Sequence, residues 1–286
     1  MATSVGTISS AAAVNRRLSR ALAYTVALLI AAIVIVPLVY VLVGGFRTTG
    51  QIAAKPVDLP HPWVTGNYTE ILHSGSFWRE VANSTFIAII TTVVVVAAGA
   101  LAAFPLSRYL FRGREGLYTL FTLGLLFPVS VAVLPLYILL RQMGLLDHLI
   151  GVALPDAAFG LPVTIVILRP FMRAVPAELE DAAIIDGCSR FGFFWRVLLP
   201  LSRPALMTVS ILAFVKSWNN FLLPLLVLTD EHGWTLPLGV ANYSTQYSQD
   251  TARVLAFTAL SMLPALCFFV LAERRIVGGL SGAVKG

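Results

Sequence analysis

Long runs of apolar residues, separated by short polar segments, dominate the chain. Six runs approach the roughly 20 residues that a helix needs to cross about 30 Å of hydrocarbon, namely Ala21–Val43, Val81–Phe104, Leu117–Leu140, Leu149–Leu168, Ala205–Leu228 and Val254–Ala272. The fourth run holds Pro155, Asp156, Gly160 and Pro162, so its start is the least well defined. The runs are continuous and do not alternate with polar residues, which argues against strands. The pattern predicts an all-α polytopic membrane protein with six transmembrane helices.

Composition supports this reading. Of 286 residues, 58% are hydrophobic and 12% are charged, about half the charged fraction of a soluble domain. Residues 1–15 are small and polar and are expected to be disordered, and Ala21–Val43 is longer than the apolar core of a signal peptide. The expected organisation is a tail over residues 1–20, one six-span domain over residues 21–275 with a polar loop at 176–204, and a second tail over residues 276–286.

Basic residues predict the orientation. The net charge is +6, which in a chain this apolar indicates basic loops at a membrane surface and not a nucleic-acid partner. If both termini are cytoplasmic, most of the 20 Lys and Arg residues fall on the cytoplasmic side, as the positive-inside rule requires. The expected location is a bacterial cell (inner or plasma) membrane, with both termini and the 176–204 loop in the cytoplasm.

The loop from Pro176 to Pro204 is the longest charge-bearing segment of the chain. Pro176 suits the first position of a helix, and the acidic residues that follow place negative charge in its first turns, where the helix dipole favours it. Gly187 suits the end of that helix, and the Phe residues after it begin a second apolar stretch. The loop therefore reads as a short helix, a glycine turn and a second short helix at the membrane surface.

The same loop carries a family resemblance. Asp181, Ala182 and Ala183 are followed by Gly187 and, further on, by Leu199-Pro200. This order resembles the "EAA" loop of permease subunits in ATP-driven importers. The Asp-Gly pair and the Leu-Leu-Pro-Leu ending look like the carbohydrate branch, the maltose-type permeases. The family's usual leading Glu is Asp181 here, with Glu180 one residue upstream, which shortens the reach of that carboxylate.

The resemblance implies a heterodimer with a second permease subunit, two copies of a cytoplasmic ATPase, and an extracytoplasmic solute-binding protein that delivers a sugar. It also implies that the 176–190 helix sits in a groove on one ATPase. The residues expected to couple ATPase closure to alternating access are Glu180, Asp181, Ala182, Ala183, Asp186, Gly187 and Pro200.

The chain itself carries no sign of catalysis. It has no phosphate-binding Gly-x-x-x-x-Gly-Lys-Ser/Thr loop, and its four histidines are scattered rather than set at metal-ligand spacing. No metal, cofactor or enzymatic activity is therefore expected in this chain. ATP and Mg²⁺ are expected on the partner ATPase.

Polar residues inside transmembrane helices are costly and often functional. The candidates for a translocation pathway are Asn83, Lys216, Asn219 and Asn220. A purely structural alternative is that Asn83 and Asn219 bond neighbouring helices. Lys216 is expected to face a cavity, to pair with a carboxylate, or to extend toward the interface.

Three other functions compete with a sugar importer. An importer of osmolytes, amino acids or phosphate esters would share the loop. A secondary transporter would need carboxylates inside the membrane, but the runs hold almost none except Asp156, which the pattern places near the end of a span. A non-transporting scaffold gives no reason for the spacing between Asp181 and Pro200.

Overall fold

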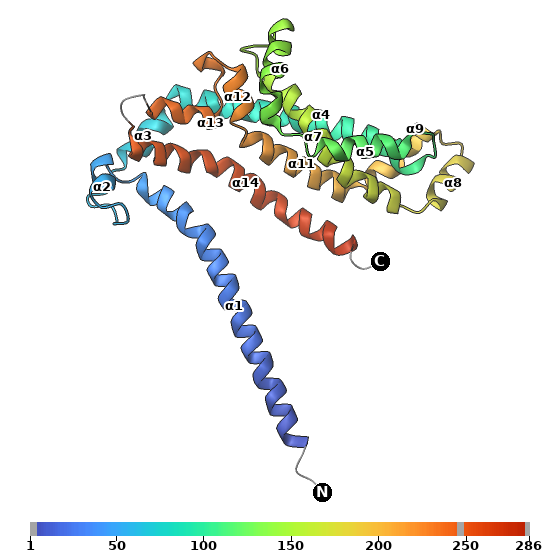
Figure 1. The fold of residues 1–286 in the computed structure, drawn as a ribbon, viewed down its shortest axis with the longest axis horizontal. Helices are drawn as coiled ribbons and strands as arrows, with labels where there is room; N and C mark the ends of the chain where they lie inside the picture. Colours follow the sequence, from blue (N-terminus) through green and yellow to red (C-terminus); the bar gives the residue numbers. More distant parts are fainter. Residues whose placement is uncertain (1–4, 245–248, 284–286) are drawn as a thin grey trace. The chain divides into compact units, whose positions relative to one another are not determined.

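The structure is a computed structural model that describes the backbone of residues 5–244 and 249–283 and the side chains of residues 20–244 and 249–268. Helices account for its regular structure, and this part of the chain contains no β-strand (Figure 1). The α-helices are α1 (Val5–Gly44), α2 (Thr49–Ala54), α3 (Gly66–His73), α4 (Gly75–Arg108), α5 (Arg114–Gly124), α6 (Val129–Gln142), α7 (Leu149–Ala174), α8 (Glu178–Ile185), α9 (Arg190–Phe193), α10 (Leu199–Leu201), α11 (Arg203–Trp218), α12 (Leu222–Val227), α13 (Leu236–Gly239) and α14 (Thr251–Ala283). A π-turn, Phe194–Leu198, joins α9 to α10, and 3₁₀ turns cover Glu231–Gly233 and Val240–Tyr243.

Four helical segments are long and apolar enough to cross a membrane, namely Arg20–Gly44, Gly75–Arg108, Leu149–Ala174 and Thr251–Phe268. Two further pairs of helices pass the same test together but are bent, by 98° between α5 and α6 and by 76° between residues 190–201 and α11. The described chain thus has four candidate spans, or up to six if each bent pair counts as one. The all-α membrane fold is confirmed.

Two of the six expected spans are interrupted. The run Leu117–Leu140 breaks between α5 and α6, where Pro128 is the N-cap of α6 and cannot continue a helix from the preceding residues. The run Ala205–Leu228 breaks after Trp218, and a new helix, α12, begins at Leu222 with Phe221 as its N-cap. At this break the side chain of Asn220 accepts a hydrogen bond from the Leu223 backbone nitrogen at 3.3 Å.

Two other segments are more helical than expected. The run from Leu149 is one unbroken helix, α7, despite Pro155, Pro162 and Pro170 inside it. Helix α1 begins at Val5, so residues 5–15 are helical where we expected disorder, and residues 1–4 lie outside the described part. The long apolar helix after Arg20 continues toward the N-terminus through residues 5–19. Extending an existing helix is favourable, because each added residue contributes one hydrogen bond.

The chain divides into two compact units by its internal contacts, described here separately. The first unit comprises residues 5–71 and 249–260. In it, the buried guanidinium of Arg47 donates to the carbonyls of Gln51, Lys55 and Pro56. The amide of Asn67 donates to the carbonyls of Gly45 and Arg47 at 2.9 and 2.8 Å. These bonds close the loop between α1 and α3.

The second unit comprises residues 72–244 and 261–283, and α4, α7 and α11 run side by side in it (Figure 1). Helices α4 and α7 approach closely at two glycines. A Cβ added at Gly99 would collide with the Thr164 methyl group, and one at Gly160 would lie 2.9 Å from Val95 Cγ2. Small residues let helices pack closely where lipid gives no hydrophobic drive for association.

Two buried apolar clusters fill the second unit. One joins the end of α4 to α7 and α9 and includes Phe104, Leu168, Met172, Phe193 and Phe194. The other joins α4, α6, α7 and α12 and includes Ile87, Leu140, Val152, Leu223 and Val227. The first cluster anchors the segment that contains the predicted coupling loop, and the second anchors the loop at the opposite end of α4.

Candidate functional site

The predicted coupling loop has the expected order of elements. Helix α8 spans Glu178–Ile185, Gly187 follows with a φ of +79°, and α9 begins at Arg190 after Ser189, whose hydroxyl accepts from the Gly192 nitrogen at 3.1 Å. The helix starts later than predicted. The backbone nitrogens of Glu180 and Asp181 both bond the Ala177 carbonyl, so Pro176 precedes the cap instead of occupying the first helical position.

Glu180 is turned into the protein. Its Oε2 lies 2.8 Å from the Nε of Arg108, the last residue of α4, and the two side chains are 12% and 6% exposed. Arg108 also donates to the backbone carbonyls of Val175 at 2.6 Å and Pro176 at 3.4 Å. The Arg108 guanidinium thus binds both the Glu180 carboxylate in α8 and the backbone segment that precedes α8.

A cavity of about 420 Å³ opens beside this pair, and Arg108, Tyr109, Arg173, Glu180 and Arg190 contribute to its lining. The Arg190 guanidinium lies over the Tyr109 ring, 5.0 Å from its centroid. Burial, helped by the negative charge of Glu180, raises the pKa of Tyr109 to about 12. Tyr109 therefore stays neutral beside the carboxylate at physiological pH.

The remaining acids of the loop point outward. Glu178, Asp181 and Asp186 are exposed, as are Ala182 and Gly187. Apolar side chains share this surface, with Leu179 at 42%, Ile184 at 48% and Ile185 at 86% exposure. Exposed apolar residues mixed with one sign of charge are typical of a protein-binding surface.

The other two predicted coupling residues are placed differently. Ala183 packs against the Phe193–Phe194 cluster, and Pro200 is half-buried in α10. Ala183 thus attaches the loop to the helices behind it, while Asp181, Ala182, Asp186 and Gly187 remain accessible.

Three of the four predicted pathway residues meet at one cavity. Lys216, Asn219 and Asn220 line a space of about 390 Å³ together with Asp156, Phe159 and Phe221. Asn219 bonds its own helix, donating to the Val215 carbonyl at 2.8 Å. Lys216 also lines a second cavity of about 220 Å³ between α7 and α11.

Asp156 is the functional candidate that the sequence pattern misplaced. It lies well inside α7 and not near a span end, and it is 2% exposed. Its Oδ1 accepts from Asn220 Nδ2 at 3.1 Å, whereas its Oδ2 has no hydrogen-bond partner among the described residues. Lys216 lines the same cavity. This buried carboxylate therefore acts on the cavity through Asn220, whose amide it holds at the cavity wall.

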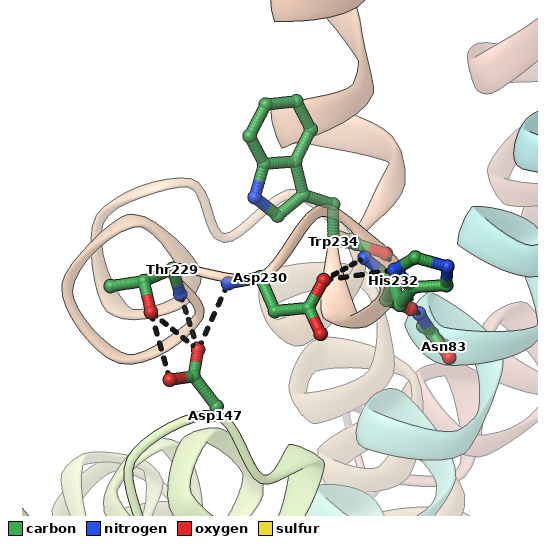
Figure 2. Close-up of polar contacts among 6 residues, drawn as sticks. All are labelled: Asn83, Asp147, Thr229, Asp230, His232 and Trp234. Atoms are coloured by element: carbon green, nitrogen blue, oxygen red, sulfur yellow. Dashed lines mark hydrogen bonds and ion pairs between the residues drawn. The ribbon is translucent and has the colours of Figure 1, made fainter.

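Asn83 lies apart from this cavity. It donates from Nδ2 to the carbonyls of His232 at 3.0 Å and Trp234 at 2.9 Å, in the loop between α12 and α13 (Figure 2). The structure thus places Asn83 in a loop-binding role near the start of α4, closer to the structural alternative than to a pathway role.

A second carboxylate holds the same loop. Asp147, in the turn between α6 and α7, accepts from the backbone nitrogens of Thr229 at 2.6 Å and Asp230 at 3.0 Å, and from the Thr229 hydroxyl at 2.8 Å (Figure 2). These hydrogen bonds, led by the one from Asp230, lower the pKa of Asp147. The loop is thereby attached to α4 and to the α6–α7 turn.

Comparisons with known proteins agree on one family. The family model described as binding-protein-dependent transport system inner membrane component matches residues 95–274. The chain is 34% identical to the diacetylchitobiose uptake system permease protein NgcG of Streptomyces coelicolor over 276 residues, which cover 96% of this chain and 91% of that protein. It is 37% identical to the trehalose transport system permease protein SugB of Mycobacterium tuberculosis over 231 residues, which cover 80% of this chain and 84% of that protein.

The fold is also found among solved structures. A chain of a bacterial ABC transporter involved in the import of the acidic polysaccharide alginate superposes with a TM-score of 0.79 at 21% identity, covering 91% of this chain and 97% of that one. At this identity the likeness shows the fold alone. It extends over nearly the whole chain, beyond the segment that the family model matches.

Proposed function

Because the chain belongs to the family of binding-protein-dependent transport system inner membrane components, we propose that it is the transmembrane permease subunit of an ATP-driven importer of a sugar or oligosaccharide. The family match covers the coupling loop, α7 and α11. The two relatives described above are named for uptake of diacetylchitobiose and trehalose, which supports a saccharide as the solute.

The observation that carries this proposal is the exposed face of α8. Its outward acids and apolar residues are attached through Glu180, Ala183 and Arg108 to the spans behind them. One face of α8 is attached to the transmembrane helices, and the opposite face is exposed. Such a helix suits a partner protein that binds the exposed face and moves the helix. We assign that partner as the ATPase, with Glu178, Asp181 and Asp186 supplying the charges that it meets.

The assembly and orientation follow from the same assignment. A second permease subunit, two ATPase copies and an extracytoplasmic solute-binding protein complete the importer, with ATP and Mg²⁺ bound by the ATPases. The chain lies in the bacterial inner membrane with both termini and the 176–204 loop in the cytoplasm. Closure of the ATPases then moves α8 and its attached spans as one body and exchanges inward-facing for outward-facing access.

The cavity at Asp156 is the part of the pathway that this subunit provides. The amides of Asn219 and Asn220 and the Lys216 ammonium offer acceptors and donors to hydroxyl groups. Phe159 and Phe221 add flat apolar surface to the same wall. Side chains of this kind orient a saccharide, and Asn83 is not among them.

The test is transport by the reconstituted complex. The chain would be co-expressed with the permease, ATPase and binding-protein genes beside it, purified, and placed in proteoliposomes. We expect uptake of labelled diacetylchitobiose or trehalose that requires internal ATP and the external binding protein.

Two outcomes would contradict the proposal. If the complex takes up an osmolyte, amino acid or phosphate ester but no saccharide, the solute belongs to that class and not to the sugars. Uptake driven by an ion gradient in the absence of ATP would identify a secondary transporter and would overturn the function.

A further inference from the structure

Helix α4 is bound at its outer end to the α12–α13 loop and the segment after it. Asn83 donates to the His232 and Trp234 carbonyls, and the Leu236 backbone nitrogen donates to the Ser84 hydroxyl at 2.9 Å. One turn earlier, the carboxylate of Glu80 accepts from Asn242 Nδ2 at 2.8 Å. Ser84 and Glu80 are 3% and 1% exposed. Side chains of three residues within two turns of one helix therefore hold the segment from His232 to Asn242 (Figure 2 shows the Asn83 contacts).

The inner end of the same helix is bound to the coupling loop. Arg108 is the last residue of α4, and its guanidinium reaches the Glu180 carboxylate and two carbonyls at the start of that loop. It also lies over the ring of Phe193 in α9, 5.6 Å from the centroid. Charge-assisted hydrogen bonds of this kind are stronger than neutral ones, and the pair is shielded from water.

Between these ends α4 is continuous. Its 34 residues form one helix, which at 1.5 Å per residue is about 50 Å long. Close contacts of Gly99 with Thr164 and of Val95 with Gly160 press it against α7 along its middle. A helix packed this tightly moves as a rigid element, because protein interiors resist gradual deformation.

We propose that α4 is the mechanical link between the two faces of the importer, with Asn83 and Ser84 as positioning residues at one end and Arg108 at the other. A binding protein that docks on the outer loop shifts the segment that Asn83 holds, and α4 carries this shift to α8 through Arg108. By linkage, ATPase closure must act back on the outer loop through the same helix. This inference rests on the proposed function and specifies how its two partners communicate.

The test removes side-chain contacts at each end of α4 in the complete reconstituted importer. Asn83→Leu removes the outer hydrogen bonds, and Arg108→Gln removes the inner charge. ATP hydrolysis is measured with and without saturating binding protein. We expect basal hydrolysis to stay within about twofold and stimulation by the binding protein to fall about fivefold or more in each variant, the range of ordinary coupling free energies.

Two further variants separate a positioning role from a merely structural one. The double variant Asn83→Leu/Arg108→Gln should be no worse than the poorer single variant, because both changes interrupt one link. The exchanged pair Arg108→Glu/Glu180→Arg restores opposite charges and should recover part of the stimulation. Arg112→Gln is the matched control, since Arg112 is an exposed arginine four residues beyond Arg108.

The results that overturn the inference are distinct from failure of the proposed function. Full stimulation in both single variants, or losses that multiply in the double variant, would show that α4 is not the link. If Arg108→Gln fails to assemble, Arg108→Lys and Ser84→Ala give the same reading at each end, and full stimulation in both would equally overturn it. An unaltered complex that shows no stimulation by any binding protein would instead contradict the proposed function.

Discussion

Asn220 donates a hydrogen bond to Asp156 across 3.1 Å, which ties the break between α11 and α12 to the interior of α7. The same amide accepts from the Leu223 nitrogen in the first turn of α12. The break in the span and the polar cavity thus share the residue Asn220. A kinked span exposes groups that a straight helix would satisfy internally, and here they line a cavity.

The first prediction concerns this carboxylate. Asp156→Leu removes the acceptor that holds the Asn220 amide at the cavity wall. Saccharide uptake should fall about tenfold or more at equal expression, because a displaced Asn220 leaves solute hydroxyls unpaired at a cost of roughly 1–3 kcal/mol. Asp156→Asn keeps one acceptor and should lose less. Asp58→Asn, a change at an exposed acid in the first unit, is the control. Normal uptake by Asp156→Leu would place the solute elsewhere, in the partner permease.

The second prediction concerns Gly187. Its φ of +79° is costly for a residue with a side chain, by roughly 1–2 kcal/mol, and Asn tolerates it best. A Cβ there meets no atom within 4 Å, so only backbone strain opposes substitution. Gly187→Ala should impair ATP hydrolysis stimulated by the binding protein, and Gly187→Asn should be mildest. Gly187→Asp should leave the protein in the membrane and abolish the stimulation, because it adds a negative charge to an exposed turn assigned to the ATPase contact. Equal stimulation in all three variants would show that the turn is irrelevant to coupling.

The third prediction concerns the α4–α7 contact. Gly99→Ala drives a methyl group into the Thr164 methyl, an overpacking that typically costs about 1–3 kcal/mol. The thermal midpoint of the purified complex should fall. Thr164→Ser removes the colliding methyl but keeps a hydroxyl, which in Thr164 bonds the Gly160 carbonyl, so it should restore stability in the double variant. Gly116→Ala, where a Cβ meets nothing within 4 Å, should be neutral or slightly stabilising. Absence of rescue by Thr164→Ser would refute the contact.

The fourth prediction concerns pH at the outer loop. The pKa of Asp147 is lowered from its ordinary 3.8 by hydrogen bonds that its charged form accepts. Its contribution to loop stability is therefore complete above about pH 4 and is lost as the pH falls through the lower folded-state pKa. Limited proteolysis within residues 229–235 should stay slow from neutral pH down to about pH 5. Asp147→Ala should raise cleavage at neutral pH, modestly because the carboxylate is exposed. Unchanged cleavage would mean that the contacts from α4 hold the loop without Asp147.

The fifth prediction concerns orientation. Cys188 lies in the coupling loop and is half-buried, and both cysteines are free. With Cys267 replaced by Ala, a membrane-impermeant thiol reagent should label Cys188 only after permeabilisation. Val57→Cys in a cysteine-free background should be labelled on intact cells, because Val57 is 91% exposed and is assigned to the outer face. Labelling of Cys188 on intact cells would reverse the topology.

Local signals made parts of this architecture predictable. The acidic first turn and Gly187 predict α8 and its termination from neighbouring residues alone, because caps and positive-φ turns are local. The start of α8 was predicted too early, since Pro176 resembles a first-turn proline until the Ala177 carbonyl is seen to accept the first helical bonds.

Tertiary partners could not be predicted in the same way. Glu180 reads as an ATPase contact in the sequence, but its partner Arg108 lies 72 residues away. Asp156 reads as a residue near a span end, because Pro155 and Pro162 suggested a break that α7 does not have. Asn219 and Asn220 were predicted as pathway residues inside a span, and the structure places both at the break between α11 and α12, with Asn219 as the C-cap of α11.

The burial of Arg108 and of Arg169, whose side chain is 8% exposed and contacts Glu115, has a consequence for biogenesis. In the proposed orientation both arginines count toward the cytoplasmic charge that orients the nascent chain, yet in the folded protein neither is free to face lipid headgroups. The two arginines must therefore influence the orientation of the chain during its insertion into the membrane, before the helices have packed together. A substitution at either position can therefore misdirect newly made protein without any defect in the copies that have already folded.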